Sequence, residues 1–559
     1  MKKHKHVYLE ISVLILILSV FFLIGLLRIK NSDGFFTEDE IAHYMLTYSA
    51  KDRFGNLIEV YNKPLFALLY YPFVRAGIEY ARLLTLIIST MTLFLVFSLS
   101  RRLQINSLIS VLILATFPAF FSISIANLTE PLAALLLILT CYFTASEKYK
   151  ISALFGGLLP LTRFEGAFLL ACFIIYWLTR KELKAVLVSL YGLLLWWITS
   201  FIYTKDALWL YESFRIYGTK YRQESVDVSY WFKRLIHIFG PAGLFLLLIG
   251  FVKSLKEKPL YIFLFSIFML INIILSYIGT YSRYDRFFVT ISPVVCIIAS
   301  IGFSNLSKKQ LSPHLFYLAS FLFILVDGYY EIQGRHLEQT YLYRYIPIFI
   351  ILSSFMIFGF NWHFINKWII IALSSVLLLQ VFLKYFTSFE IPFPYIRLAR
   401  FWLVLSASAF IVKTVLSRTK NKKLEIIFPI IFISALPVSL ILPIMSFAKP
   451  RQFYQRMNIE EKMCENAVKW FIKNLSNEKK ARCNNSLIWY FFAKHSKDMK
   501  IDYRESNKYE DLDYPVIWDS RYSSNIDKYP SGYKIIYQEE NISPYFNNRK
   551  FEIIIFKKP

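Results

Sequence analysis

The chain has 559 residues, of which 56% are hydrophobic and only 18% charged, with a mean hydropathy of +0.46. Soluble proteins carry about 25% charged residues, so this composition excludes a soluble globular protein of this size. The formal net charge of +25 would suit nucleic acid, but the lysines and arginines gather in short breaks between long apolar runs. That distribution is typical of the cytoplasmic loops of membrane proteins, and we expect no nucleic-acid partner.

Apolar runs of about 17–25 residues, long enough to cross a bilayer core as a helix, recur along the first four fifths of the chain. They predict an all-α polytopic membrane protein with about fifteen transmembrane helices. The first run lacks a small-x-small cleavage site, so we expect it to be retained. The expected spans are residues 7–28, 82–100, 106–125, 128–145, 150–161, 165–179, 185–203, 235–252, 259–279, 287–304, 312–327, 345–360, 367–386, 400–417 and 426–447.

The charges between these spans predict the orientation of the chain. With a cytoplasmic N-terminus, every short basic break lies inside and the longer segments, which hold most loop acids, lie outside. We therefore expect the loop 29–81 and the C-terminal region to be extracytoplasmic, in a multi-pass protein of the cell membrane. The inner breaks carry Arg101-Arg102, Lys148/Lys150, Arg180/Lys181/Lys184, Lys253/Lys256/Lys258, Lys308-Lys309, Lys367 and Arg418/Lys420/Lys422/Lys423.

The region 448–559 is polar and differs abruptly from the rest. Its short alternating stretches, 533–537 and 551–556, read as strands. We expect a small extracytoplasmic α+β domain there. The predicted organisation is a transmembrane core at 1–305, additional transmembrane helices at 306–447 and the soluble domain at 448–559.

Ionisable residues gather at the outer ends of spans, where charge near a membrane is costly and often functional. Carboxylates that can accept a proton thus share one side of the membrane with cations that can hold a phosphate. The candidate residues are Asp39 and Glu40, within the triplet that begins at Glu38, and Lys63, Glu130, Arg163, Glu165, Arg283 and Arg286.

Each cluster also has an ordinary structural interpretation. The acidic triplet could be solvated loop, and Thr129-Glu130-Pro131 is a good helix start with Thr129 as the cap. Arg163 with Glu165 could form a structural ion pair, and Lys63 could snorkel. The joint occurrence of these clusters, in order and on one side, favours a functional site.

The ordered series resembles the C-superfamily of glycosyltransferases, which includes protein O-mannosyltransferases and the aminoarabinose transferase of lipid A. Asp-Glu-x-x-x-Tyr of its first outer loop matches 39–44, and a Lys-Pro-Pro-Leu-Tyr-type segment resembles 63–66. Leu65 and Phe287 depart from that pattern, and the match covers roughly residues 1–305. The other matching segments are 81–83, 101–103, 129–132, 161–166 and 285–293.

The resemblance implies an inverting transfer of a sugar, a hexose such as mannose, from a polyprenyl- or dolichyl-phosphate carrier to an acceptor hydroxyl at the outer face. In that reading Asp39 is the general base and Glu40 orients Asp39 or the acceptor. Lys63, Arg163 and Arg286, with Arg283 second, would stabilise the phosphate leaving group.

The sequence leaves several alternatives open. The acceptor could be protein, lipid or glycan. No Cys-x-x-Cys or Cys/His spacing indicates a structural metal site, and basic side chains could suffice without one, although His43 or Glu130 could ligate a divalent metal. The main rival functions are a transporter or flippase for lipid-linked sugars and a polysaccharide polymerase or ligase. A transporter predicts charges near the midplane and inverted repeats, and the sequence shows neither clearly.

Overall fold

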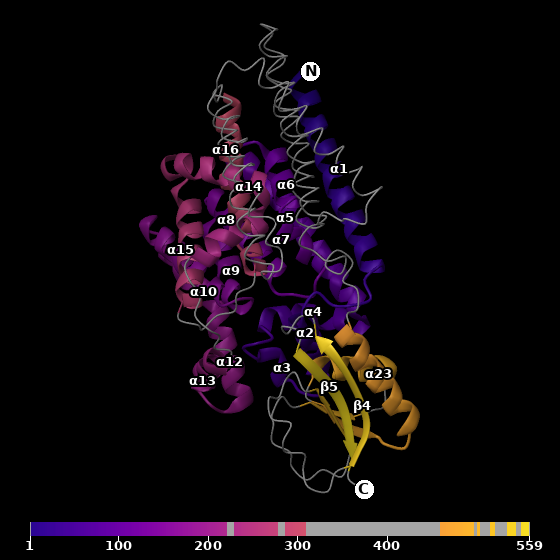
Figure 1. Cartoon of the computed structure of the whole chain (residues 1–559). Coiled ribbons are helices and arrows are strands. Elements are labelled where there is room, and N and C mark those ends of the chain that lie inside the picture. Colours follow the sequence, from indigo (N-terminus) through magenta and orange to yellow (C-terminus); the bar gives the residue numbers. More distant parts are fainter. Residues whose placement is uncertain are drawn as a thin grey trace, which may run out of the picture.

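The computed structural model describes residues 2–220, 229–277, 285–308, 459–483, 485–496, 500–503, 515–519, 534–543 and 549–557. The five spans expected between 312 and 447, and the candidate Arg283, lie outside these residues. Figure 1 shows a helical bundle at one end and a β-sheet with two helices at the other, with short helices between them.

The helical part begins with α1, which runs along the edge of the bundle beside α5 (Figure 1). Its elements are α1 (Lys2–Lys30), α2 (Glu38–Tyr48), η1 (Ser49–Lys51), α3 (Gly55–Ile58), α4 (Pro64–Ala76), α5 (Ile78–Arg102), α6 (Ser107–Ala115), α7 (Pro118–Ile123), α8 (Glu130–Ala145), α9 (Tyr149–Gly156), η2 (Leu159–Leu161), α10 (Glu165–Thr179), α11 (Leu183–Ser189), α12 (Tyr191–Thr204), α13 (Trp209–Lys220), α14 (Ser229–Glu257), α15 (Pro259–Tyr277), η3 (Asp285–Val289) and α16 (Ser292–Lys308).

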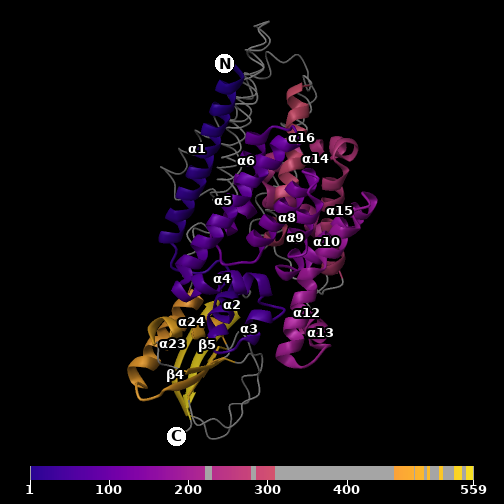
Figure 2. The ribbon, with the colours of Figure 1, turned by 180° about the vertical axis from the view of Figure 1, so that it is seen from behind.

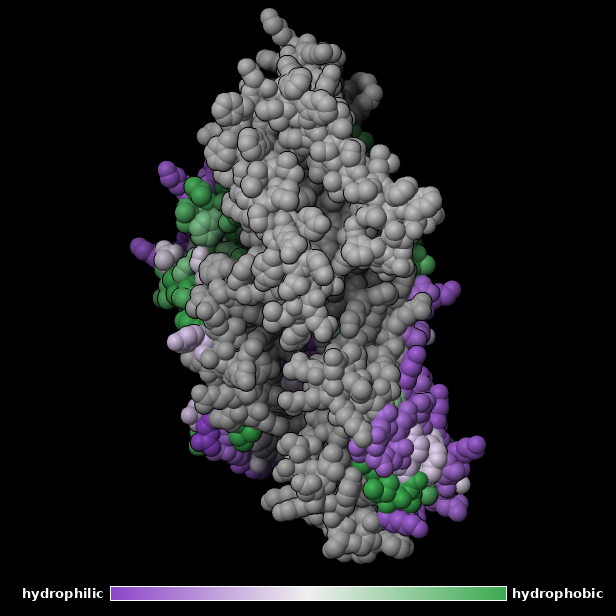
Figure 3. All heavy atoms as spheres, viewed as in Figure 1, coloured by the Kyte–Doolittle hydropathy of each residue, from purple (hydrophilic) through white to green (hydrophobic). Residues whose placement is uncertain are grey.

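Within the described residues, four helical segments are long and apolar enough to cross a membrane: Tyr8–Lys30, Ile78–Arg102, Leu183–Thr204 and Pro259–Tyr277. Shorter apolar helices at α8, α9–η2, α10 and α16 accompany them. Figure 3 shows apolar side chains along one flank of the bundle and mainly hydrophilic ones, with a smaller apolar patch, at the opposite end of the molecule. The expectation of a mainly helical multi-pass membrane protein is confirmed, whereas the count of fifteen spans and the orientation stay predictions.

Two expected spans are not single helices. The span 106–125 is wrong as one helix, because α6 ends at Ala115 and α7 begins at Pro118. Proline has no N–H to continue a helix and suits its first turn, which explains the break. The span 185–203 lies within Leu183–Thr204, which is long and apolar enough to cross a membrane, with a one-residue turn at Leu190 between α11 and α12.

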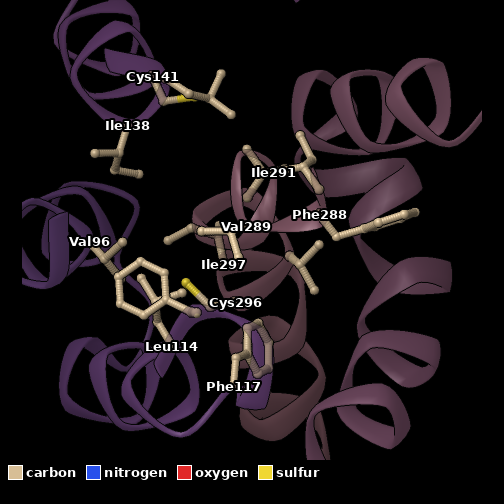
Figure 4. Close-up of a cluster of buried hydrophobic side chains, with 14 of the residues drawn as sticks. Val96, Leu114, Phe117, Ile138, Cys141, Phe288, Val289, Ile291, Cys296 and Ile297 are labelled. Atoms are coloured by element: carbon tan, nitrogen blue, oxygen red, sulfur yellow. The ribbon is translucent and has the colours of Figure 1, made fainter. Parts of the chain in front are cut away.

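The core of the bundle is formed where α5, α6, α8 and α16 meet. Figure 4 shows Val96, Leu114, Ile138 and Ile297 pointing into one cluster with Phe288 of η3 nearby. All five side chains are buried. Because η3 belongs to this apolar cluster, the polar residues on the same short turn are held in a fixed place.

The C-terminal part is a mixed five-stranded sheet of order β2-β1-β3-β5-β4 with two helices. β1 is parallel to β2 and β3, whereas β5 is antiparallel to β3 and β4. The alternating stretches noted in the sequence form β4 and β5. The elements are α23 (Ile459–Asn474), β1 (Lys480–Cys483), α24 (Ser486–His495), β2 (Lys500–Tyr503), β3 (Val516–Asp519), β4 (Lys534–Ser543) and β5 (Arg549–Lys557).

This C-terminal part contacts the short helices between the bundle and the sheet. Seen from behind, α24 lies against α2 (Figure 2). Phe35 and Tyr44 share one hydrophobic cluster with Phe491 and Ile555. The helix that begins at Glu38 is therefore packed on one side by the C-terminal part.

The crossing of α14 and α16 predicts a stability effect at Gly302. A Cβ atom there would lie 2.2 Å from the carbonyl oxygen of Leu246 and 2.8 Å from the backbone nitrogen of Gly250. Because backbone atoms cannot rotate away, Gly302→Ala should lower the free energy of unfolding by about 1–3 kcal/mol. Thermal unfolding in detergent measures this, with Val252→Ala, an exposed position of α14, as the control. Equal melting temperatures for the two variants would contradict the close crossing.

Candidate functional site

Asp39 lies in the first turn of α2, two residues after the N-cap Thr37. The three acids of that turn are favoured there, because a helix N-terminus carries partial positive charge. The Asp39 side chain is about 30% exposed. Its Oδ1 accepts a 2.5 Å hydrogen bond from the Tyr61 hydroxyl, and its Oδ2 pairs with Arg286. The acidic triplet that begins at Glu38 is therefore the ordered first turn of a helix and not a solvated loop.

Arg286 reaches this carboxylate from η3, almost 250 residues further along the chain. Its Nη1 donates to Thr37 Oγ1 at 2.7 Å, and its Nε lies 3.2 Å from Glu130 Oε1. The arginine is thus held between the start of α2 and the start of α8. It joins the candidate base to the second acidic candidate.

Arg163 extends the same network. It lies 2.8 Å from Glu130 Oε1 and makes a two-pronged pair with Glu165, at 2.9 and 3.2 Å. Its guanidinium also lies over the Phe287 ring, 4.3 Å from the centroid. Five candidate residues, namely Asp39, Arg286, Glu130, Arg163 and Glu165, therefore form one continuous chain of ion pairs.

Glu130 is the centre of this chain. Thr129 occupies the N-cap position of α8, as the sequence suggested, but its side chain makes no capping bond, and its hydroxyl accepts a 3.2 Å hydrogen bond from Arg163. Glu130 is 1% exposed. Its Oε2 has no hydrogen-bond donor among the described residues. A buried acceptor without a donor is energetically unfavourable and fits a ligand that brings one.

Lys63 is buried directly before α4 with φ +62°, a conformation that non-glycine residues rarely adopt. Such backbone strain costs about 1–3 kcal/mol and gathers at functional sites. The Nζ donates to the Val60 carbonyl at 2.5 Å and lies 3.4 Å from the centroid of the Phe164 ring. Phe164 directly follows Arg163, so Lys63 lies beside the ion-pair network.

His43 and Asn62 form a polar layer behind Asp39. The His43 ring stacks on Tyr61 at 5.0 Å, and its Nδ1 lies 3.3 Å from Asn62 Oδ1. Asn62 is fully buried and also donates to Asn56 O at 2.8 Å. These contacts fix the Tyr61 ring and thereby the hydroxyl that donates to Asp39.

Glu40 has a different environment from Asp39, although the two are adjacent in sequence. Its side chain is fully buried, and Oε1 accepts from Arg82 Nε at 2.9 Å and from the Asn127 amide at 3.0 Å. Its Oε2 accepts from the Phe36 amide at 2.6 Å. Glu40 therefore anchors the start of α2 to α5 and to the segment before α8, which suits orienting Asp39 better than touching a substrate.

Charge and burial act in opposite directions at this site. Burial disfavours the charged form of Asp39, but Arg286 and the Tyr61 hydroxyl outweigh it and lower the pKa of Asp39 to about 2. The stabilisation from this ionised carboxylate is complete above about pH 4 and is lost as the pH falls through about 2. Burial lowers the pKa of His43 to about 4 in spite of the Asp39 and Glu130 carboxylates, so the imidazole is neutral at pH 7.

Burial, followed by the positive charge of Arg163, lowers the pKa of Lys63 well below its ordinary value. Two arginines of the network face three carboxylates, those of Asp39, Glu130 and Glu165. Both guanidiniums are thus already matched by acids before any ligand binds.

Sequence reasoning missed Tyr61, Thr37 and Phe287 as site residues. Tyr61 lies two positions before Lys63 with no motif of its own, and only the fold brings it to Asp39. Phe287 was noted as a departure from the family pattern, and its ring lies under Arg163. Within the described residues no group of three or more His, Cys, Asp or Glu side chains could hold a metal ion.

The fold is shared with a known membrane protein. The apo structure of ArnT from Cupriavidus metallidurans matches with a TM-score of 0.54 and 10% identity over 98% of both chains. The structure of the same protein bound to undecaprenyl phosphate matches with a TM-score of 0.52 and 10% identity over 97% of both chains. The chain has the fold of ArnT. ArnT is the aminoarabinose transferase, so the expected likeness to its fold is confirmed, whereas the number of spans stays a prediction.

No protein-family model and no curated protein matches the sequence. The likeness to ArnT therefore rests on the arrangement of the chain in space. At 10% identity it establishes the fold, and the site geometry of this chain is the independent observation on its chemistry.

The environment of Glu40 predicts a large structural effect. Glu40→Ala removes the partner of Arg82, which is 2% exposed, and breaking a buried pair in this way costs about 3–5 kcal/mol. Thermal unfolding of the detergent-solubilised protein should show a clear loss of stability. Glu38→Ala is the matched control, because Glu38 is the exposed acid of the same turn. Equal stability of the two variants would exclude an anchoring role for Glu40.

Proposed function

We propose that this protein is a membrane glycosyltransferase that moves a sugar from a polyprenyl-phosphate carrier to an acceptor hydroxyl at the extracytoplasmic face. The observation that carries the proposal is the meeting of Asp39 with Arg286 and Glu130 in one network, on the fold of ArnT. A proton acceptor and a phosphate-binding cation are the two groups that such a transfer requires.

Asp39 is the general base in this proposal. It is the carboxylate of the network that keeps about 30% of its surface accessible, so an acceptor hydroxyl can approach it. The Tyr61 hydroxyl fixes Oδ1, and the other oxygen is free to take the proton once Arg286 leaves it. Attack on the anomeric carbon from the side opposite the phosphate would invert that centre.

Arg286 and Lys63 are the proposed phosphate ligands. A guanidinium offers two parallel donors to phosphate oxygens, and an ammonium offers a point charge. Lys63 has a lowered pKa, and an arriving phosphate would favour its charged form. The Glu130 carboxylate then keeps Arg163 and Arg286 in position and offers its Oε2 to a sugar hydroxyl.

The shared contacts of Arg286 suggest how donor and base are coupled. Arg286 pairs with Asp39 in the structure and keeps the pKa of that carboxyl at about 2, which makes it a weak base. When Arg286 turns to a phosphate, Asp39 loses the partner that lowers its pKa, and burial then raises its affinity for a proton. Donor binding thus prepares the base.

The base assignment predicts the effect of Asp39→Asn. The variant should lose transfer from a radiolabelled polyprenyl-phosphate sugar in membrane fractions by about 10²–10⁴-fold, the usual contribution of a general base. The variant should lose the stabilisation from the ionised carboxylate but stay folded, because Arg286 keeps Glu130 and Thr37 as partners. Glu38→Gln, the exposed neighbour, is the control. Transfer that survives Asp39→Asn would remove Asp39 as the base.

The coupling predicts a second, counter-intuitive effect of the same variant. Asp39→Asn should bind farnesyl phosphate, a short polyprenyl phosphate, roughly tenfold more tightly, equivalent to about 1.4 kcal/mol, because Arg286 no longer has to leave a carboxylate. Calorimetric titration of the purified protein in nanodiscs measures the dissociation constant.

A double-mutant cycle separates this competition from plain repulsion between Asp39 and phosphate. In the Arg286→Gln background, competition predicts that Asp39→Asn has no further effect on farnesyl phosphate binding. Repulsion predicts the same tightening in both backgrounds. An unchanged tightening would disprove the shared role of Arg286 without touching the assignment of Asp39 as base.

A further inference from the structure

A cavity of about 290 Å³ lies outside the ion-pair network, where the turn between α4 and α5 meets α2 and α24. Three elements distant in sequence contribute to its wall, one of them from the C-terminal part. Four of its ten lining residues are tyrosines, one is an acid and one is a base, and the side chains used below are Tyr44, Tyr48, Glu79, Tyr80, Tyr490 and Lys494.

The tyrosine rings form a fixed corner. The Tyr44 hydroxyl donates to the Val74 carbonyl at 3.1 Å, which holds its ring in place. Tyr48 lies nearly parallel to Tyr44, with centroids 6.2 Å apart, and Tyr490 meets Tyr44 at 74° and 5.8 Å. The Arg75 guanidinium already lies over the Tyr48 ring, 4.7 Å from its centroid, and the electron-rich faces of such a corner attract an ammonium group in the same way.

The cavity also contains both signs of charge. Glu79 is an exposed first-turn residue of α5 and makes no ion pair within the described part of the chain. Lys494 comes from the last turn of α24, is 44% exposed, and pairs at 3.5 Å with Glu465. An acid near the aromatic corner and a base at the opposite element match a ligand that carries a cation and an anion.

The position of α5 brings this cavity to the membrane surface. The 25 residues of Ile78–Arg102 give a helix about 37 Å long, against a bilayer core of about 30 Å. The first residues of α5 therefore reach the headgroup level, as the half-exposed Tyr80 also indicates. Figure 1 shows α4, which leads into the start of α5, between the bundle and the sheet.

We propose that this cavity binds the headgroup of a zwitterionic phospholipid, with the ammonium against the tyrosine faces and Glu79 and the phosphate near Lys494. A neutral or purely anionic headgroup would leave Glu79 without a partner. This proposal requires only that the chain lies in a membrane. It does not depend on the proposed sugar transfer, and its test does not measure that transfer.

A photocrosslinking experiment tests this site in the full-length protein. The chain is placed in liposomes of equal parts phosphatidylethanolamine and phosphatidylglycerol, with benzoylphenylalanine at Tyr80. The matched control carries it at Met91, a half-exposed position further along the same helix, which samples the bulk lipid. Mass spectrometry gives the ratio of the two lipid adducts at each position.

At Tyr80 the adducts should be enriched in phosphatidylethanolamine roughly two- to fivefold over Met91, the preference expected from one exposed cation–π contact. Glu79→Gln should reduce the enrichment, because the ammonium loses its acidic partner, while the protein elutes as before in size-exclusion chromatography. The same lipid ratio at both positions, or an enrichment that Glu79→Gln leaves unchanged, would overturn the proposal.

Discussion

The interaction on which the rest of the site depends is the pairing of Arg286 with both Asp39 and Glu130. Charges taken out of water must find partners, because an unpaired buried ion costs several kcal/mol. Arg286 is 7% exposed and Glu130 is 1% exposed, so neither can stay charged alone. Their pairing fixes η3 against the starts of α2 and α8, and Arg163 adds the start of α10. Four segments that are far apart in sequence thus meet at one point.

The same pairing gives the site its chemical character. Glu130 and Glu165 are first-turn residues of α8 and α10, where a helix N-terminus favours negative charge. The carboxylates hold the arginines ready but also occupy them. In the proposed function, a phosphate would bind by replacing Asp39 as the partner of Arg286, at little net change in the number of ion pairs. Binding to such a site is favourable for an anionic ligand that can replace the Asp39 carboxylate on Arg286. It is unfavourable for a ligand without a negative charge, because Arg286 would then lose a partner.

Much of the architecture could be predicted from the sequence, because apolar run length directly limits what crosses a membrane. α1, α5, α8 and α10 begin and end close to the expected spans. The break between α6 and α7 was missed, although Pro118 was its visible signal. Candidates such as Arg163 and Glu165 could be found because charge at a span end is rare. Their partners could not be predicted, since pairing depends on how the helices pack.

The neighbours Asp39 and Glu40 show where sequence reasoning ends. One residue along a helix turns a side chain by about 100°, so Asp39 faces Arg286 while Glu40 faces Arg82. No motif distinguishes an accessible carboxylate from a buried anchor one position away. Tyr61 had no signal at all, because its role is set only by the distance of its hydroxyl from Asp39.

The helix α2 is packed on two faces, by the ion-pair network on one and by the C-terminal part on the other. The network lies on the face of Asp39, whereas Tyr44 and Tyr48, about 140° and 180° further round the helix, face the cavity and α24. A displacement of α24 would therefore move α2 and, with it, the carboxylate that faces Arg286. The described residues of the C-terminal part thus contact the short helix that carries the proposed base.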